Sequence, residues 1–287
     1  MIIKAPASTA NLGPGFDSLG MAVSLYLEVE VLSVADRFQV DHVMKGIPHD
    51  EKNLIVKTAL TVYPGLPPLH LRVKSNIPLA HGLGSSSSAI AAGIELANQI
   101  GKLGLSDEEK VQLGAKIEGH PDNIAPTILG GLVVGAEVNH HFDAVEAPLP
   151  PYALVAYVPD YNLETKTARA VLPKELAFGV ATHGSAVANT LIASLFAQDY
   201  PKAGELMEQD VFHEVYREKL VPELVKVREV AHSKHALATY LSGAGSTIMT
   251  WIEDKHVAGF LSGLRKHDLK DETLILHPDE QGVQVIQ

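Results

Sequence analysis

The sequence contains no cysteine among its 287 residues, which excludes disulfide bonds and thiolate chemistry. It also has no apolar run of the roughly 18 residues that a membrane-spanning helix needs. The first residues, Met-Ile-Ile-Lys-Ala-Pro, lack the pattern of a signal peptide. We therefore expect a cytoplasmic protein that does not associate with a membrane.

Basic residues are in deficit, with 23 Lys and Arg against 34 Asp and Glu and a formal net charge of −11. This balance argues against a nucleic-acid-binding surface, which needs clustered positive charge. It does not exclude an anionic small substrate, because local clusters decide that. The fourteen His residues are scattered without the spacing of metal ligands, so we predict no structural metal.

Residues 77–94 combine a glycine-rich turn with the start of an Ala-rich helix, after a β-like run at residues 70–74. Gly82 and Gly84 permit a tight turn and leave no Cβ to block an approaching group. Serines 85–88 are good N-cap residues, so the helix is expected to begin among them. Its free N–H groups and dipole predict a phosphate site, and serine hydroxyls can also ligate Mg²⁺. A Ser-rich turn that only caps a helix is the alternative.

Two common phosphate loops do not fit this stretch. No Lys follows Gly84 as a Walker A loop requires, and Ser87 stands where a Rossmann fingerprint has its third Gly. The run Pro-Leu-Ala-His-Gly-Leu-Gly-Ser-Ser-Ser instead resembles the ATP loop of the GHMP kinases. The resemblance implies that ATP is bound by Pro78, Leu79, Ala80, His81, Gly82, Leu83, Gly84, Ser85, Ser86, Ser87, Ser88 and Ala89.

A first strand is expected at residues 2–5, followed by a loop at residues 6–20 that is rich in Pro, Gly and Asn. The loop carries one amide, Asn11, and one carboxylate, Asp17, and a plain turn with an Asx cap would also explain them. Residues 5–17 resemble the N-terminal motif of the homoserine kinases, a family within the GHMP kinases. The resemblance makes Asn11 and Asp17 substrate-binding residues. The ammonium group of an amino-acid substrate needs a partner, and Asp17, with Asn11 from the same loop, is the candidate.

Ser106 begins a capping box, and the helix that follows is expected to end near Glu118. The next residues, Glu-Gly-His-Pro-Asp-Asn-Ile-Ala-Pro, resemble the second homoserine-kinase motif. The resemblance makes Glu118 a Mg²⁺ ligand together with a serine of the loop, for which we choose Ser86. From the residues alone, a surface acid followed by a capping His and a turn stays possible.

Within the same motif, the resemblance places His120 and Asn123 in the substrate site, with Asn123 orienting the hydroxyl that attacks ATP. A neutral amide cannot act as a base, so direct transfer with the γ-phosphate accepting the proton is plausible. Asp122 is the one nearby carboxylate that could instead take that proton.

Two arginine segments follow in the second half of the chain. Thr165 and Arg169 lie at i and i+4 of an expected helix and share a face, although a solvated surface Arg would look the same. The segment resembles the family's Asn-x-x-Thr-x-x-Ala-Arg pattern, and Arg217 begins a stretch that resembles Arg-x-x-Leu-x-Pro. The resemblance places Thr165, Arg169 and Arg217 in the substrate pocket.

The run Ser-Gly-Ala-Gly-Ser at residues 242–246 is a tight loop that could be a simple connection between two strands. It resembles the third GHMP motif, although Ser246 replaces the Pro of many members. The resemblance adds Gly243 and Gly245 to the ATP site. It also adds Asn53, at the start of an expected helix at residues 53–63, to the nucleoside pocket.

The joint resemblance implies an α+β, two-domain GHMP kinase fold with mixed sheets covered by helices and the active site between the domains. The Pro-rich stretch at residues 145–151 marks the expected boundary, between an ATP-binding domain at 1–150 and a second domain at 151–287. The resemblance implies ATP- and Mg²⁺-dependent phosphorylation of L-homoserine, in threonine biosynthesis, by a homodimer.

Two other functions stay open. One is another GHMP kinase, acting on mevalonate or a sugar, and the other is a non-catalytic nucleotide-binding paralogue. Two substrate arginines favour an acceptor with a free carboxylate over a sugar. Phosphoryl transfer depends mainly on positioning and charge neutralisation, which these motifs can supply.

Overall fold

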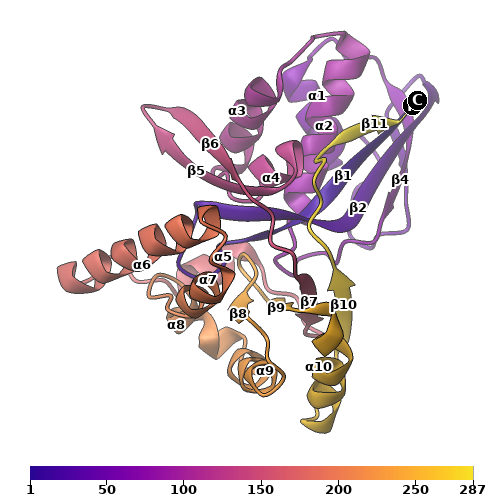
Figure 1. The fold of residues 1–287 in the computed structure, drawn as a ribbon. Coiled ribbons are helices and arrows are strands. Elements are labelled where there is room, and N and C mark those ends of the chain that lie inside the picture. The colour runs from indigo at the N-terminus through magenta and orange to yellow at the C-terminus, as the bar shows by residue number, and fades with distance from the viewer. Residues whose placement is uncertain (287) are drawn as a thin grey trace.

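The computed structural model describes residues 1–286, which form two β-sheets with helices packed against them (Figure 1). The first sheet has seven strands: β1 (Ile2–Ala10), β2 (Leu19–Val34), β3 (Gln39–Asp41), β4 (Leu69–Ser75), β5 (Leu132–Val138), β6 (His141–Ala147) and β11 (Gln284–Ile286). Its order is β11-β1-β2-β4-β3, and the β5–β6 hairpin pairs with β2. Among the strands of the described residues, only β3 and β4 run parallel, so the sheet is mixed, as the fold class predicted.

β1 is longer than the sequence predicted, because residues 6–10 belong to the strand and not to the following loop. These residues pair with β2 and are buried. The register shifts between Pro6 and Ala7, and such a bulge accommodates a proline that a regular strand would not. The loop that carries Asn11 and Asp17 is therefore held between two long, buried strands.

Three helices contact strands of the first sheet, namely α2 (Ser85–Gly101), α3 (Asp107–Glu118) and α4 (Ile124–Leu129), and α1 (Leu54–Val62) packs against α2. The predicted capping box is confirmed, since the Ser106 side chain accepts from the N–H of Glu109 and the Glu109 side chain accepts from Ser106. α3 ends at Glu118 because Gly119 adopts a left-handed φ of 87°.

The second sheet has the order β10-β7-β9-β8 and is antiparallel, with strands β7 (Ala153–Val158), β8 (Ala238–Leu241), β9 (Ile248–Ile252) and β10 (Glu272–Leu276). Its helices are α5 (Thr165–Ala170), α6 (Phe178–Phe196), α7 (Tyr200–Met207), α8 (Glu214–Arg217), α9 (Glu223–His232) and α10 (Asp254–Lys266). A 3₁₀ turn, η1 (Glu218–Leu220), follows α8. Within residues 1–286, no helix is long and apolar enough to cross a membrane.

β7 is buried on both faces, and its residues alternate between two hydrophobic clusters. Leu154 and Ala156 join the cluster that also contains the core of the first sheet. Val155 and Tyr157 join a second cluster together with residues of α9 and α10. The two sheets thus share one core, which fixes the loops of one sheet relative to those of the other.

The expected domain boundary at residue 150 stays a prediction. The last described strand, β11, pairs with β1, so residues 284–286 lie in the first sheet although the expected division assigns them to the second domain. The yellow end of the chain in Figure 1 follows this return from β10 to β11.

Candidate active site

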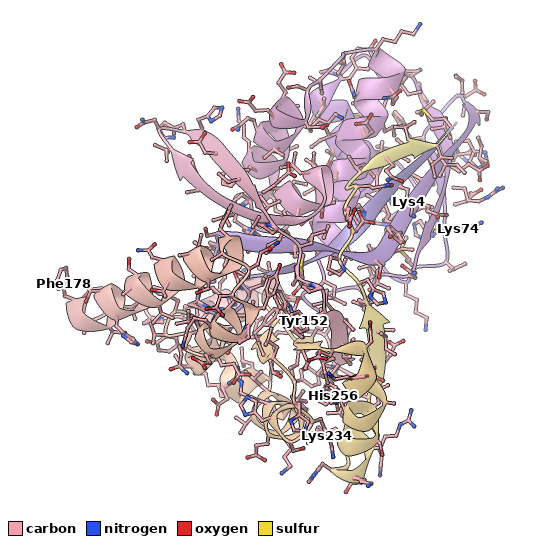
Figure 2. The ribbon with its side chains drawn as sticks, in the orientation of Figure 1. Lys4, Lys74, Tyr152, Phe178, Lys234 and His256 are labelled. Carbon is pink, nitrogen blue, oxygen red and sulfur yellow. The ribbon has the colours of Figure 1, made fainter. Side chains whose placement is uncertain are left out.

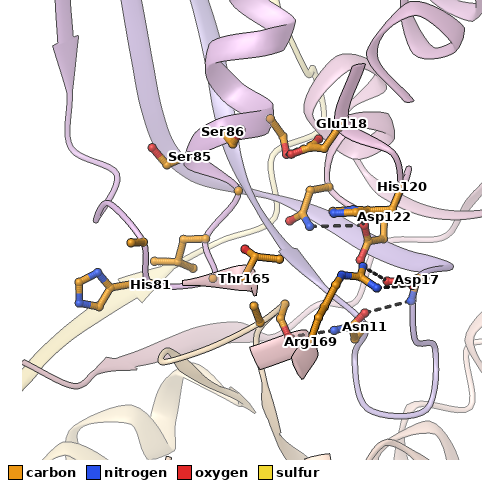
Figure 3. A pocket seen from close by; sticks show the side chains of 18 of the residues that line it. Asn11, Asp17, His81, Ser85, Ser86, Glu118, His120, Asp122, Thr165 and Arg169 are labelled. Carbon is orange, nitrogen blue, oxygen red and sulfur yellow. Dashed lines mark hydrogen bonds and ion pairs between the residues drawn. The ribbon is translucent and has the colours of Figure 1, made fainter. Parts of the chain in front are cut away.

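A cavity of about 330 Å³ lies where the loops of the two sheets meet. Its walls come from the β1–β2 loop, the glycine loop before α2, the α3–α4 connection, α5, α8 and the β8–β9 loop (Figure 3). The predicted site residues that line it are Asn11, Asp17, Pro78, Ala80, His81, Gly82, Leu83, Gly84, Ser85, Ser86, Ser87, Glu118, His120, Asn123, Thr165, Arg169, Arg217 and Gly243. Segments separated by more than 200 residues therefore contribute to one pocket.

The glycine loop leads directly into α2, which begins at Ser85. The N-cap is Gly84 in the left-handed conformation, with φ 66°, and no side chain caps the helix. The helix begins among the serines, as predicted, but none of them is the N-cap, because a left-handed N-cap strongly favours glycine over serine. The first turn, formed by serines, leaves its N–H groups without intrahelical partners and open to an anion.

The two glycines are needed for contacts within the protein itself. A Cβ on Gly84 would lie 2.1 Å from Ser8 Oγ in β1, and one on Gly82 would lie 2.2 Å from the carbonyl oxygen of Ser242. Both distances are far below van der Waals contact. The loop thus packs tightly against β1 on one side and against the β8–β9 loop on the other, so the missing Cβ atoms serve internal packing, and their role in admitting a ligand stays a prediction.

The serines of α2 point in different directions. Ser86 is exposed at the pocket, whereas Ser88 is buried and donates to the carbonyl oxygen of Pro6 at 2.8 Å. Ser87 Oγ lies 2.7 Å from both carboxylate oxygens of Glu118. The side chain of Ser87, and not that of the predicted Ser86, contacts Glu118 directly.

Glu118 is a partly buried carboxylate at the C-terminal end of α3. Burial raises its pKa to about 7, against the opposing effect of the Ser87 hydrogen bond. Nearby His120 lowers this pKa and Asp122 raises it, both to a smaller extent. Glu118 therefore lacks a strong cationic partner among the residues described, and a bound cation would stabilise its ionised form.

Asn123 faces the pocket from the N-terminus of α4. Its Oδ1 accepts a hydrogen bond from the buried hydroxyl of Ser8 at 3.0 Å, which directs the Nδ2 group toward the Asp122 carboxylate, 3.5 Å away. Sequence reasoning missed Ser8 because it treated this part of β1 as loop. Ser8 fixes the amide orientation, so Asn123 presents a donor to the site.

His120 and Asp122 form a close pair. His120 Nδ1 lies 2.7 Å from Asp122 Oδ1, and this contact raises the pKa of His120 above its usual value. Asp122 is 4% exposed and lines the cavity, although the set of site residues chosen from the sequence omitted it.

Arg169 on α5 reaches across the cavity to Asp17 in the β1–β2 loop (Figure 3). Its Nη2 lies 2.7 Å from Oδ1 and its Nη1 lies 3.1 Å from Oδ2, a bidentate geometry. The two side chains are 38% and 36% exposed, so both remain in reach of solvent.

Arg217 is almost completely buried, and its guanidinium group is held by backbone carbonyl oxygens. Nε donates to Ala168 and Nη1 donates to Gly243, at 3.1 and 2.9 Å. The Gly243 carbonyl also accepts from Asn11 Nδ2 at 3.0 Å. Burial, and secondarily the charge of Arg169, lowers the pKa of Arg217 to about 10, so the group remains charged at neutral pH.

Phe16 is a second residue that sequence reasoning missed, although it stands beside Asp17 in the first motif. Its ring centroid lies 5.5 Å from the Cζ of Arg169 and 5.3 Å from that of Arg217. An aromatic ring at this distance attracts both cations and lessens the cost of placing them near each other.

Five predicted residues are not among those that line the cavity, namely Asn53, Leu79, Ser88, Ala89 and Gly245. Asn53 is 2% exposed and caps α1, where its Oδ1 accepts from the N–H of Ile55 and its Nδ2 donates to Pro48. Its amide is thus used within the fold, and nucleotide binding by this side chain stays a prediction.

The chain matches two family models, the GHMP kinases N terminal domain over residues 53–131 and the GHMP kinases C terminal domain over residues 191–267. A homoserine kinase of Lactobacillus acidophilus is 82% identical over the full length of both chains. The solved structure of a putative homoserine kinase from Listeria monocytogenes is 42% identical, with a TM-score of 0.89 and coverage of 100% of this chain and 99% of that one.

A mevalonate kinase structure matches with a TM-score of 0.74 at 16% identity, covering 98% of this chain and 100% of that chain, and shows the shared fold alone.

Proposed function

Because the chain belongs to the homoserine kinases of the GHMP kinase family, it uses ATP to phosphorylate the homoserine hydroxyl, a step in threonine biosynthesis, and we propose how its residues perform this reaction. The observation that carries the proposal is the charge arrangement around Arg169. Two arginines and one aspartate converge on the same cavity, next to a helix N-terminus that suits phosphate.

L-Homoserine carries an ammonium and a carboxylate on one carbon, and a selective pocket must pair both charges. In the proposal, Arg169 and Arg217 bind the carboxylate, and Asp17 binds the ammonium. Within residues 1–286, no acceptor is found for Arg217 Nη2, which leaves this donor for the substrate. Thr165 and His120 complete the wall around the amino acid.

The Asn11 side chain forms hydrogen bonds within the protein, which the sequence did not predict. Its Nδ2 donates to Gly243 and its Oδ1 accepts from the backbone N–H of Asp17 at 3.1 Å. Asn11 therefore holds the loop that presents Asp17, and the second lone pair of its Oδ1 can still accept from the substrate ammonium.

In the proposal, phosphoryl transfer takes place inside this cavity, between the glycine loop before α2 and the residues that bind homoserine. The first turn of α2 and the glycine loop would bind the phosphates of ATP through backbone N–H groups. Asn123 Nδ2 would donate to the substrate hydroxyl and align it with the γ-phosphorus. The oxygen–phosphorus bond forms as the bond to ADP breaks, and the hydroxyl proton passes to a γ-phosphate oxygen.

The residues present fit Mg²⁺. Within the described part of the chain, no group of three or more His, Asp or Glu could hold a metal alone. Glu118 nonetheless offers a carboxylate whose ionised form lacks a strong partner, with the hydroxyls of Ser86 and Ser87 at hand. Mg²⁺ commonly binds through one or two carboxylates plus substrate phosphates, and there it would neutralise phosphate charge.

A homodimer is part of the proposal, and α6 is the surface we assign to it. Residues 178–196 contain no Asp, Glu, Lys or Arg, and Phe178 lies 85% exposed at the outer end of the projecting helix (Figure 2). Two copies that each carry a net charge of −11 repel each other. Contact through a charge-free helix keeps that repulsion lowest.

One assay tests the assignment as a whole. ADP release should depend on Mg²⁺ and on L-homoserine, with O-phospho-L-homoserine as the product identified by mass spectrometry. Mevalonate and 1,3-butanediol should not support it, because neither pairs with both Asp17 and the arginines. Use of mevalonate as readily as homoserine, or nucleotide binding without turnover on any acceptor, would overturn the proposal.

A further inference from the structure

His213 is a fully buried imidazole just before α8 and is not part of the site derived above. It lies between the β1–β2 loop and Arg217. Its Nε2 is 2.9 Å from the carbonyl oxygen of Gly13 in the β1–β2 loop, 200 residues away in sequence. Its Nδ1 is 3.1 Å from Nη1 of Arg217.

These two contacts define the state of the ring. A carbonyl oxygen only accepts hydrogen bonds, so Nε2 must carry a proton. A guanidinium group only donates, so Nδ1 must be unprotonated. His213 is therefore the neutral tautomer with its proton on Nε2, and it serves Arg217 as an acceptor.

The surroundings of His213 keep the ring in this position. Oδ2 of Asp210 accepts from the backbone N–H groups of His213 and Glu214, at 2.9 and 2.7 Å, and holds the start of α8. Phe16 stacks on the ring, with centroids 5.2 Å apart and planes 22° apart. On the far side, Gly13 cannot be replaced without strain, because a Cβ there would lie 1.8 Å from the carbonyl oxygen of Met207.

A neutral acceptor suits an arginine that must bind an anion. If a carboxylate held Nη1, its charge would neutralise Arg217 and weaken attraction for the substrate carboxylate. The acceptors found are instead neutral, namely His213 and the carbonyl oxygens of Ala168 and Gly243. They accept hydrogen bonds from three N–H groups of the guanidinium and do not neutralise its positive charge, which remains available to the ligand.

We propose that His213 is a positioning residue for homoserine recognition. Its Nδ1 accepts a hydrogen bond that orients Arg217. Its Nε2 donates to Gly13 and so connects the loop that carries Phe16 and Asp17 to α8. One ring thus sets the distance between the group that binds the substrate carboxylate and the group that binds its ammonium. The inference rests on the proposed assignment of Arg217 to the homoserine carboxylate.

Two matched substitutions separate the two hydrogen bonds. In His213→Asn the side-chain oxygen can take the place of Nδ1, which preserves the acceptor for Arg217 and loses the bond to Gly13. In His213→Gln the amide nitrogen can take the place of Nε2, which preserves the bond to Gly13 and loses the acceptor. Both remove the ring, so both lose the stacking on Phe16.

We expect His213→Gln to raise the KM for homoserine about tenfold or more, the scale of losing one hydrogen bond to a charged group. The KM for ATP should change less than about twofold, because the phosphate loop is untouched. His213→Asn should keep the homoserine KM several-fold lower than His213→Gln does, at similar thermal stability. Equal KM values for the two variants, or values that only follow the loss of stability, would reduce His213 to a packing role.

Two controls keep the outcomes distinct. If Arg217→Met leaves the homoserine KM unchanged, the assignment of Arg217 fails and the proposal for His213 fails with it. If Arg217→Met raises that KM while the two His213 variants behave alike, only the His213 proposal fails.

Nitrogen NMR of the wild-type protein tests the tautomer without any variant. The spectrum should show His213 with a proton on Nε2 alone. A proton on Nδ1 would contradict the acceptor role.

Discussion

Arg169 and Asp17 form a bidentate ion pair across the pocket, with 2.7 Å between Nη2 and Oδ1 and 3.1 Å between Nη1 and Oδ2. Each of these residues is assigned to the oppositely charged group of a zwitterionic substrate. On binding, homoserine can therefore replace the Arg169–Asp17 ion pair by two ion pairs, one between its carboxylate and Arg169 and one between its ammonium and Asp17. The exchange costs little, since both side chains are more than a third exposed and such pairs are weak.

Arg169→Leu should raise the KM for homoserine roughly 30-fold or more, about 2 kcal/mol of lost binding, and leave the KM for ATP nearly unchanged. Steady-state kinetics with each substrate varied in turn measures both values. Arg72→Leu is a matched control, because Arg72 pairs with Glu30 on the exposed surface of the first sheet. A normal homoserine KM in Arg169→Leu would remove Arg169 from the pocket.

Glu118→Gln should raise the Mg²⁺ concentration needed for half-maximal rate and lower kcat about 100-fold, the scale of losing a key electrostatic group. Glu137→Gln, at the exposed end of β5, serves as the control.

Since the pKa of Glu118 is about 7, protons compete with Mg²⁺, and the apparent Mg²⁺ affinity of the wild type should weaken as pH falls below 7. Glu118→Gln should lose this pH dependence. If the variant instead requires the same Mg²⁺ concentration as the wild type, Glu118 does not bind the metal.

The same carboxyl should affect stability in the absence of metal. Its folded pKa is above its ordinary value of 4.5, so the folded protein binds more protons than the unfolded chain between these values. Its contribution to stability is therefore fully present below pH 4.5 and is lost as pH rises to about 7. Urea midpoints measured across this window should fall less steeply with pH in Glu118→Gln than in the wild type.

Asp122→Asn tests where the hydroxyl proton goes. If the γ-phosphate accepts it, the variant should keep kcat within about tenfold, because the change affects the contacts with His120 and Asn123 and not the proton acceptor. A loss of 1,000-fold or so, with a changed pH profile and unaltered substrate KM values, would instead identify Asp122 as the general base. The measurement is kcat as a function of pH at saturating substrates.

Gly84→Ala should destabilise the fold as well as weaken ATP binding, because its Cβ meets Ser8 Oγ at 2.1 Å. The expected cost is about 2 kcal/mol or more, from the clash and the left-handed φ. Ser8→Ala removes the clashing oxygen, so the double variant should be more stable than the sum of the two single changes predicts. Thermal denaturation of all four proteins gives the coupling, and strict additivity would show that the two residues do not touch.

Phe178→Glu on α6 should convert a dimer into a monomer by placing a charge in the proposed contact. Light scattering after size-exclusion chromatography reports the mass directly. Val43→Glu is the control, since Val43 is 99% exposed and lies far from α6 in sequence, near β3. A dimer that withstands the change at Phe178 would place the interface elsewhere.

The sequence predicted the fold and most of the residues that line the pocket because its three motif loops resemble those of the GHMP kinases and are unusual strings of Gly, Pro, Asn and Ser. It was wrong about the length of β1, since proline composition suggested a loop where a bulge keeps the strand intact. Its choice of Ser86 among the serines of α2 had no geometric basis, because one residue turns a side chain by about 100° around a helix. The choice depends on the helix start, which a glycine sets.

The residues that sequence reasoning missed act through contacts between distant segments. Ser8 meets Asn123 across 115 positions, and His213 meets Gly13 across 200. No local sequence pattern indicates such pairs, since a lone Ser in a strand or a lone His before a helix has many ordinary explanations. Asn53 shows the reverse case, because a residue singled out for nucleotide is occupied as a helix cap.

The pairing of β11 with β1 has a consequence for the order in which the first sheet can form. Residues 2–4 pair with residues 284–286, which stand 280 to 284 positions later in the sequence. Until β11 docks, one edge of β1 has no partner and can bind a strand of another chain. Closing the first sheet therefore also protects the protein against association through that edge.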